Sequence, residues 1–310
     1  MSTQTDTVAQ TVGVREVAPP VMSVTRVFYW SVRREFWENR SIYLAPLAVA
    51  GVFLIGFLIT LVHLPTKIRI LAGVNPADFR AAIVVPYDSA AGLMMVTTIF
   101  VSVYYCLETL HSERRDRSIL FWKSLPVSDL VTVLAKVIIP LVILPVITSA
   151  IAAALHLIML VLSSVVLLAA GVSPAPLWAQ LPWLHMSLLL FYHILTAHAL
   201  WPAPIYGWLL FVSAWARRAP FLWASLPVAA IGGVEAIAFG TSHFLTFVGR
   251  RLIGDATTTA FIPPENFPTN PMTHITPGPF LISSGLWVGL LITAAFVFAA
   301  IRLRRYREPV

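Results

Sequence analysis

The chain contains little charge. Lys, Arg, Asp and Glu make up only 11% of its 310 residues, whereas soluble domains carry about 25%. Hydrophobic residues make up 58%, and apolar runs of about 20 residues or more recur along the chain. A soluble core could not bury this much apolar surface. The composition therefore predicts an all-α, polytopic membrane protein.

The sequence lacks the residues that several kinds of site require. The single cysteine, Cys106, excludes an internal disulfide, so the fold does not depend on an oxidising compartment. The three lysines follow Thr, Trp and Ala, so the Gly-Lys pair of a P-loop is absent and ATP hydrolysis on this chain is not expected. No His-Glu-x-x-His motif occurs. We therefore expect no catalytic residue, no metal site and no cofactor on this chain.

The N-terminal region divides into two parts. Residues 1–21 are polar and end in a Pro pair, which predicts a disordered tail without a cleavable signal. In residues 22–39, Val27, Trp30, Arg34 and Trp37 recur at spacings of three and four. This pattern favours an amphipathic helix lying in the membrane surface. The alternative is a plain positive flank before the first span.

Residues 22–310 are expected to form one transmembrane domain with six spans. The expected spans are 42–62, 89–110, 130–168, 186–212, 221–247 and 280–301. The third region is ambiguous, because Leu130 to Gly171 is long for one span and barely enough for two. Pro140 and Pro145 should kink it near its start. The motif "WPAP" (Trp201 to Pro204) should interrupt the fourth span.

An internal echo bears on the number of spans, with chance recurrence of apolar words as the alternative. "LFWKSLPV" (Leu120 to Val127) returns as "FLWASLPV" (Phe221 to Val228), and an Arg pair precedes each copy. If both copies enter the membrane from the same side, the third region is one span. With six spans, 16 of the 21 Lys and Arg lie on one side, which the positive-inside rule makes the cytoplasm. The net charge of +7 then indicates cytoplasmic loops and not nucleic-acid binding. Both termini are expected in the cytoplasm.

The stretch "ERRDRSILFWKSLPVSD" (Glu113 to Asp129) concentrates charge between two oily segments. A helix starting at Glu113 would place Arg117 one turn later, where the two can pair. Pro126 would end this helix, and the aromatic pair Phe121 and Trp122 would face the membrane or a partner. The stretch therefore favours a short, stiff amphipathic helix joining two spans. A positive loop with an aromatic belt remains the alternative.

This stretch resembles the segment after the second span in permeases of the type-2 ABC exporter family. "AWARRAPFLWASLPV" (Ala214 to Val228) is similar to a second stretch of such bacterial permeases. In that family the first segment is the coupling helix, here about Ser112 to Leu125, which binds a groove in a separate ATPase. The resemblance implies that the following residues contact the ATPase: Glu113, Arg114, Arg115, Asp116, Arg117, Phe121 and Trp122.

The resemblance also implies an assembly and a place for it. Two ATPase subunits would bind ATP and Mg²⁺, and a second permease copy or a related permease would complete a transporter in the bacterial inner membrane. Residues 22–39 look like the family's N-terminal interface helix, and 250–279 lie where the family often has re-entrant outer helices. Alternating access would then export an unidentified substrate, which the apolar spans suggest is amphipathic or lipid-like.

Ionisable residues inside the spans are candidates for a role of their own, because a carboxylate in the membrane costs about 3 kcal/mol. Glu108 lies near a span end and can reach the headgroups. Glu235 lies deeper, behind Gly232-Gly233, and is a candidate for a bundle or dimer interface. Apolar-flanked histidines, including His156 and His193, allow a rival hypothesis of a haem- or quinone-binding membrane anchor. A channel or assembly factor without ATP coupling is a further alternative.

Overall fold

The computed structural model describes residues 23–71, 76–116, 127–253 and 277–306. Within these ranges the regular secondary structure is entirely helical. Six segments are long and apolar enough to cross a membrane, which confirms the predicted all-α, polytopic fold. These segments are Ser41–Leu61, Ile83–Arg115, Asp129–Ala169, Ala175–Leu200, Pro220–Phe239 and Ser284–Tyr306.

The first described residues form the expected N-terminal helix, α1 (Val24–Glu38). The Ser23 side chain accepts a hydrogen bond from the Arg26 N–H and caps this helix. Helix α2 (Ser41–Leu61) follows almost directly and coincides with the first predicted span. A short helix, α3 (Leu64–Leu71), comes next.

The second span lies within one long helix, α4 (Pro76–Arg115), of 40 residues. The sequence predicted a new helix starting at Glu113, and this boundary is wrong, because α4 continues through it. The charged residues after the apolar run are compatible with helix, and no Gly or Pro follows Gly92 before the helix ends. The backbone therefore continues its hydrogen bonding through Arg115. The rest of the expected coupling helix, 117–126, lies outside the described residues.

The third span is a single continuous segment of 41 residues, which confirms the one-span interpretation. It consists of α6 (Asp129–Ile138), the π-helical turn η1 (Ile139–Ile143) and α7 (Leu144–Ala169). The Leu144 N–H bonds to the carbonyl of Ile139, five residues earlier. This wider turn accommodates Pro140, which cannot donate a hydrogen bond, so the helix continues past it.

The fourth span is interrupted where the sequence predicted. Helices α8 (Ala175–Gln180) and α9 (Trp183–Leu195) lead into a second π-helical turn, η2 (Thr196–Leu200). The Trp201 N–H closes this turn on the Thr196 carbonyl, and Pro202 separates it from α10 (Ala203–Trp215). Two π-turns thus lie in neighbouring spans and contact each other.

The fifth span is shorter than predicted. Helix α11 (Pro220–Phe239) ends at Gly240, whose φ of 64° is the left-handed conformation that glycine adopts easily at helix ends. The chain then reverses into α12 (His243–Ile253). The second copy of the echo lies in the first turns of α11, with Pro227 inside the helix. Helices α13 (Pro277–Ile282) and α14 (Ser284–Tyr306) complete the chain.

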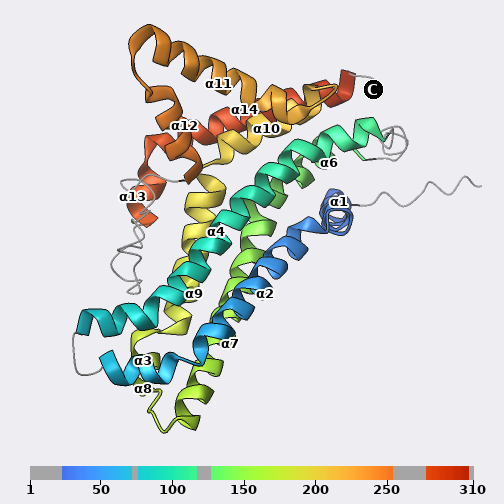
Figure 1. Cartoon of the computed structure of the whole chain (residues 1–310). Helices are drawn as coiled ribbons and strands as arrows, with labels where there is room; N and C mark the ends of the chain where they lie inside the picture. The colour runs from blue at the N-terminus through green and yellow to red at the C-terminus, as the bar shows by residue number, and fades with distance from the viewer. Residues whose placement is uncertain (1–22, 72–75, 117–126, 254–276, 307–310) are drawn as a thin grey trace, which may run out of the picture.

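Two apolar cores hold the bundle together. One lies among α2, α4, α7 and α9, and the other joins α4, α6, α10 and α14. Helices α11 and α12 form an arm beside α10 and α14 (Figure 1). One end of the bundle carries α1, the last turn of α4, the start of α6 and the last turn of α14; we call it the α1 end. Helices α3 and α8 lie at the opposite end, the α3 end (Figure 1).

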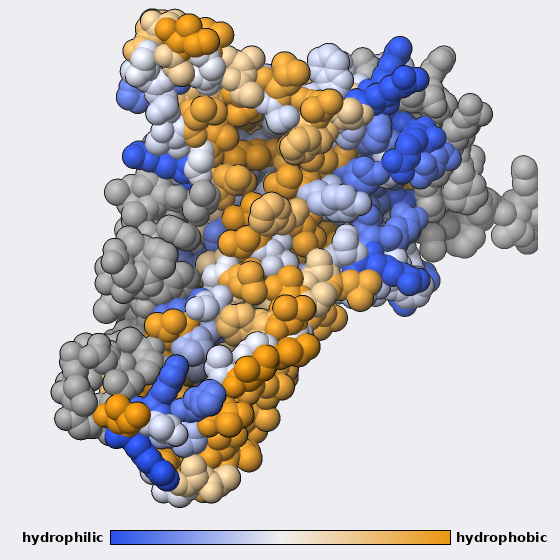
Figure 2. Space-filling model, viewed as in Figure 1, coloured by the Kyte–Doolittle hydropathy of each residue, from blue (hydrophilic) through white to orange (hydrophobic). Residues whose placement is uncertain are grey.

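The sides of the bundle are apolar. Figure 2 shows hydrophobic residues along its length, with hydrophilic residues gathered at the α1 end and near α3. Ile59 of α2 is 69% exposed and Ile237 of α11 is 90% exposed. Such side chains are stable only against lipid or another apolar surface. This distribution is that of a multi-pass membrane protein.

Candidate functional site

Six charged side chains meet at the α1 end of the bundle. They come from four helices and comprise three cations and three anions. This charge cluster consists of Arg34 and Glu35 on α1, Glu113 on α4, Asp129 and Lys136 on α6, and Arg304 on α14. Helices α1 and α6, and α6 and α14, pack directly against each other around it.

Lys136 is the centre of the charge cluster. Its side chain is 2% exposed, and its Nζ lies 2.7 Å from Glu35 Oε1 and 3.0 Å from Glu113 Oε1. The same Nζ donates to Thr109 Oγ1 at 2.9 Å. A buried ammonium needs this many partners because leaving water costs several kcal/mol. The fold therefore surrounds Lys136 with protein.

Glu35 has partners on both carboxylate oxygens. Arg34 Nη2 lies 2.8 Å from Oε1, while Tyr105 donates to Oε2 at 3.0 Å and Thr109 donates at 3.3 Å. Burial alone would raise the pKa of this carboxyl, but the charges of Lys136 and Arg34 and their hydrogen bonds hold its pKa lower, at about 2. Glu35 is therefore ionised at neutral pH and fixes α1 onto α4 and α6.

Arg304 joins the C-terminal helix to both sides of the segment 117–126. Its Nη1 pairs with Glu113 at the end of α4, and its Nε lies 3.0 Å from Asp129 Oδ1 at the start of α6. Arg304 is 5% exposed. Through this residue, the two helices that flank the segment 117–126 are attached to a third helix.

A second contact attaches the end of α4 to the end of α10. Arg114 Nη2 donates to the backbone carbonyls of Ser213, at 2.9 Å, and Ala216, at 2.6 Å. The Ser213 hydroxyl accepts the backbone N–H of His111 at 3.0 Å. A cation at the carbonyl end of a helix is favourable because the helix dipole is negative there.

The seven residues predicted to contact an ATPase differ in their exposure. Glu113 and Arg114 are buried and bonded within the chain, so their side chains do not face a partner. Arg115 and Asp116 are exposed and pair with each other at 3.0 Å. The remaining three lie outside the described residues: Arg117, Phe121 and Trp122. Because successive helical residues point about 100° apart, neighbours in one charged run face opposite environments.

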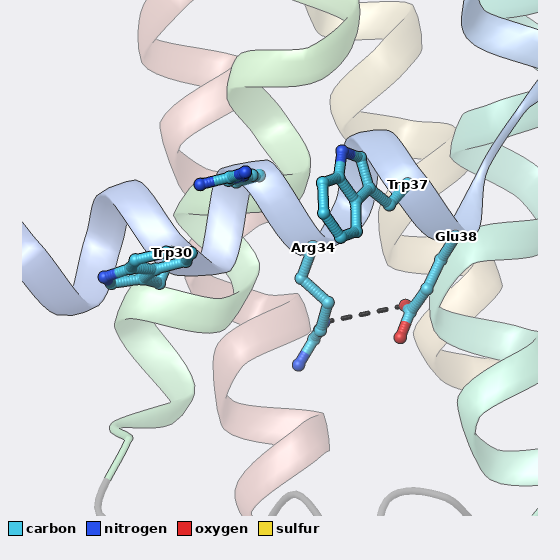
Figure 3. A pocket seen from close by; sticks show the side chains of 5 residues that line it. Trp30, Arg34, Trp37 and Glu38 are labelled. Atoms are coloured by element: carbon cyan, nitrogen blue, oxygen red, sulfur yellow. Dashed lines mark ion pairs between the residues drawn. The ribbon is translucent and has the colours of Figure 1, made fainter.

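The outward face of α1 carries a shallow aromatic pocket, which Figure 3 shows. The Arg33 guanidinium lies over the rings of Trp30 and Trp37, at 4.9 Å from each centroid. Arg34 and Glu38 form an ion pair of 3.6 Å at its edge. The volume of the pocket is about 370 Å³. Exposed Trp beside Arg is typical of helices that lie at a membrane surface.

The two acidic residues predicted inside spans have local partners. Glu108 is one-third exposed and lies 3.2 Å from Nη1 of Arg115, which is about two turns further along α4. Glu235 accepts hydrogen bonds from the Thr241 hydroxyl at 2.8 Å and from the backbone N–H groups of His243 at 2.7 Å and Phe244 at 2.8 Å. Glu235 thus closes the turn between α11 and α12 by capping the first turn of α12.

Replacement of Glu235 by Ala should loosen this turn, because two helix N–H groups and one hydroxyl lose their acceptor. Hydrogen exchange at the first amides of α12 should become faster, while exchange in α4 stays unchanged. Replacement of Glu108 by Ala is the matched control, since Glu108 bonds no backbone amide in the described chain. Equal exchange in the two variants would contradict the capping role.

No protein-family model, curated protein or solved structure matches this chain. Within the residues that the structure describes, no group of three or more His, Cys, Asp and Glu is placed to hold a metal ion. The charge cluster must therefore be interpreted from its own geometry. Sequence reasoning did not assign a site role to Glu35, Lys136 or Arg304; the one available signal was a single lysine near the start of a long apolar run.

Proposed function

We propose that this chain is the permease subunit of an ATP-driven exporter, coupled to a separate ATPase through the segment that joins α4 to α6. The observation that carries the proposal is the charge cluster. It connects both flanks of that segment, at Glu113 and Asp129, to α14 through Arg304 and to α1 through Glu35. A force applied to the segment would therefore move four helices together.

Two features of the chain support this assignment. Basic residues gather at the α1 end, next to the segment 117–126, which fits a cytoplasmic surface under the positive-inside rule. The sequence has no Gly-Lys pair, so hydrolysis belongs to a partner that would bind ATP and Mg²⁺. The exposed pair of Arg115 and Asp116 lies where that partner would approach. In this proposal both termini are cytoplasmic, and a second permease copy and two ATPase copies complete the transporter.

The mechanism would be alternating access between two arrangements of the spans. ATP-driven closure of the partners would press on the segment 117–126, and the buried ion pairs would transmit that displacement to α4, α6 and α14. Such a mechanism requires that the partner bind the two arrangements with different affinity. The apolar sides of the bundle favour an amphipathic or lipid-like substrate.

The proposal is tested with a double variant of the joining segment, Arg117→Glu with Trp122→Asp. We expect normal membrane insertion, because both positions lie outside the spans, but loss of a co-purifying nucleotide-hydrolysing subunit. The wild-type chain, purified from its native membrane, should retain that subunit and its ATPase activity.

The matched control makes the same two kinds of substitution at the opposite end of the bundle. Lys67→Glu with Trp178→Asp changes one basic residue and one exposed Trp near the α3 end. This variant should keep the partner. The proposal fails if the wild type brings down no such subunit, or if the joining-segment variant keeps it.

A further inference from the structure

Three polar side chains from three helices face one small cavity inside the bundle. Asp88 of α4, His156 of α7 and His193 of α9 line it. The other lining residues are Ala91, Met95, Met186, Leu189 and Leu190. The charge cluster lies elsewhere, toward the α1 end, and the proposed coupling uses none of these groups. Ionisable residues in spans are costly, so their meeting in one cavity calls for a function.

The size of the cavity restricts what it can hold. Its volume is about 20 Å³, and one water molecule needs about 10 to 15 Å³ measured in this way. The space therefore fits one water molecule. A porphyrin, a quinone or a lipid headgroup is far larger, so the haem and quinone hypothesis does not fit the space between His156 and His193.

His156 offers this water an unused nitrogen. The side chain is 1% exposed, and its Nε2 lies 3.1 Å from the backbone oxygen of Tyr87. Because a carbonyl only accepts, Nε2 carries the hydrogen and Nδ1 is the acceptor in the neutral ring. Nδ1 is buried and has no hydrogen-bond partner among the described residues. Buried polar atoms are nearly always bonded, so a water donating to Nδ1 is the expected partner.

A further buried imidazole lies near His193, one of the residues that line the cavity. His198, in the π-turn η2, is 2% exposed, and neither of its ring nitrogens has a hydrogen-bond partner in the described part of the chain. It is close enough to His193 for their charges to interact. Turns of this kind occur frequently at functional sites.

We propose that Asp88, His156 and His193 form an intramembrane site that binds one water molecule and a proton. The proton converts an imidazole to imidazolium, and the carboxylate of Asp88 compensates the positive charge. Asp88 is only partly buried, which gives the site access for proton exchange. Of the other helices packed on α7, α2 and α8 contain no Asp, Glu, Lys, Arg or His. On α3 and α9, Lys67 and His185 are exposed, and Arg69 bonds to the carbonyl of Ala170, just after the end of α7.

A stripe of buried polar residues on α4 leads from this site toward the charge cluster. Thr98, Ser102, Tyr105 and Thr109 follow at spacings of three and four, and each is almost fully buried. The last two donate to Glu35. One face of α4 therefore provides a polar route between the proton site and the α1 end, with apolar helices around it.

The site is tested by nitrogen NMR of the full chain in lipid nanodiscs, with ¹⁵N-labelled histidine. We expect that at least one of the His156 and His193 signals shifts to that of imidazolium as the pH falls from 8 to 4, and that His156 shows a cross-peak to water. Asp88→Asn should alter the titration of both signals, since the three side chains share one cavity. His63→Gln is the matched control, because His63 is exposed at the end of α2, and it should leave both titrations unchanged.

His156→Gln identifies the signal by its loss and should also change the titration of His193. If that variant does not fold, the comparison of wild type with Asp88→Asn still tests whether the three side chains form one site. The proposal is overturned if both imidazoles stay neutral as the pH falls from 8 to 4, if His156 shows no contact with water, or if Asp88→Asn leaves both titrations unchanged. The experiment needs no ATPase partner, so its outcome is independent of the exporter proposal.

Discussion

Replacement of Lys136 by Met is expected to lower the free energy of unfolding by about 3 to 5 kcal/mol, since it leaves buried carboxylates without their central cation. Glu35 and Glu113 would both lose a contact of 3.0 Å or less to Lys136 Nζ. The apparent melting temperature should fall by on the order of 10 °C. Cys106 is the single cysteine and is fully buried, so a thiol-reactive dye reports its exposure on unfolding.

Two further variants separate charge balance from the loss of a side chain. Lys67→Met removes an exposed lysine of α3 and should leave the melting temperature nearly unchanged. Glu35→Gln added to Lys136→Met returns the cluster to equal numbers of cations and anions, and should recover part of the lost stability. If the double variant is less stable than Lys136→Met alone, the cluster is not held by charge compensation.

The decrease of stability at acidic pH gives an independent measure of how much ionised Glu35 stabilises the fold. Its pKa is about 2 in the folded chain, and about 4.3 is usual for a glutamate in an unfolded chain. A lowered pKa contributes stability above the unfolded value, and this contribution is lost as the pH falls from about 5 toward 2. In the Glu35→Gln variant, the free energy of unfolding should therefore fall less steeply over this pH range than it does in the wild type.

Replacement of Arg114 by Met is expected to destabilise the chain, whereas the same replacement of its neighbour Arg115 is not. Arg114→Met removes two charge-assisted hydrogen bonds and leaves the carbonyls of Ser213 and Ala216 without this donor. Each such bond contributes about 1.5 to 3 kcal/mol, so we expect the two together to lower the free energy of unfolding by roughly 3 to 6 kcal/mol. The Cys106 labelling assay should show a clear decrease in melting temperature.

Arg115→Met is the matched control for stability, and it also bears on function. Arg115 is exposed, and its partners Glu108 and Asp116 are partly or largely solvent-accessible, so the melting temperature should not change measurably. Under the proposed function, this variant should instead weaken the binding of the ATPase subunit. A strong loss of stability in Arg115→Met, or none in Arg114→Met, would contradict the division of this run into buried and exposed sides.

Much of the fold was predictable because the membrane restricts the backbone. Every polar backbone group in lipid needs a partner within the protein, so apolar runs of sufficient length become helices. This explains why α2 and α14 begin and end near the predicted positions. Helix ends were less predictable where the next residues also favour helix, as at Glu113, or where a single glycine reverses the chain, as at Gly240.

The candidate site was predictable only in part. The sequence marks Glu113 to Arg117 as an unusual concentration of charge, but it does not say which side chains point inward. Lys136 was visible as a single charge in an apolar region, and its partners were not. Glu35 and Arg304 are separated from it by 101 and 168 positions, and helix packing alone brings them together.

From the residue order alone follows a bundle of membrane-spanning helices, because hydropathy and segment length act locally along the chain. Which charged side chains lie in the interior depends on how the helices pack. Ion pairs and small cavities depend on distances of a few ångströms between residues far apart in sequence. Only the packing of α1, α4, α6 and α14 fixes those distances at the charge cluster, and only the packing of α4, α7 and α9 creates the cavity at His156.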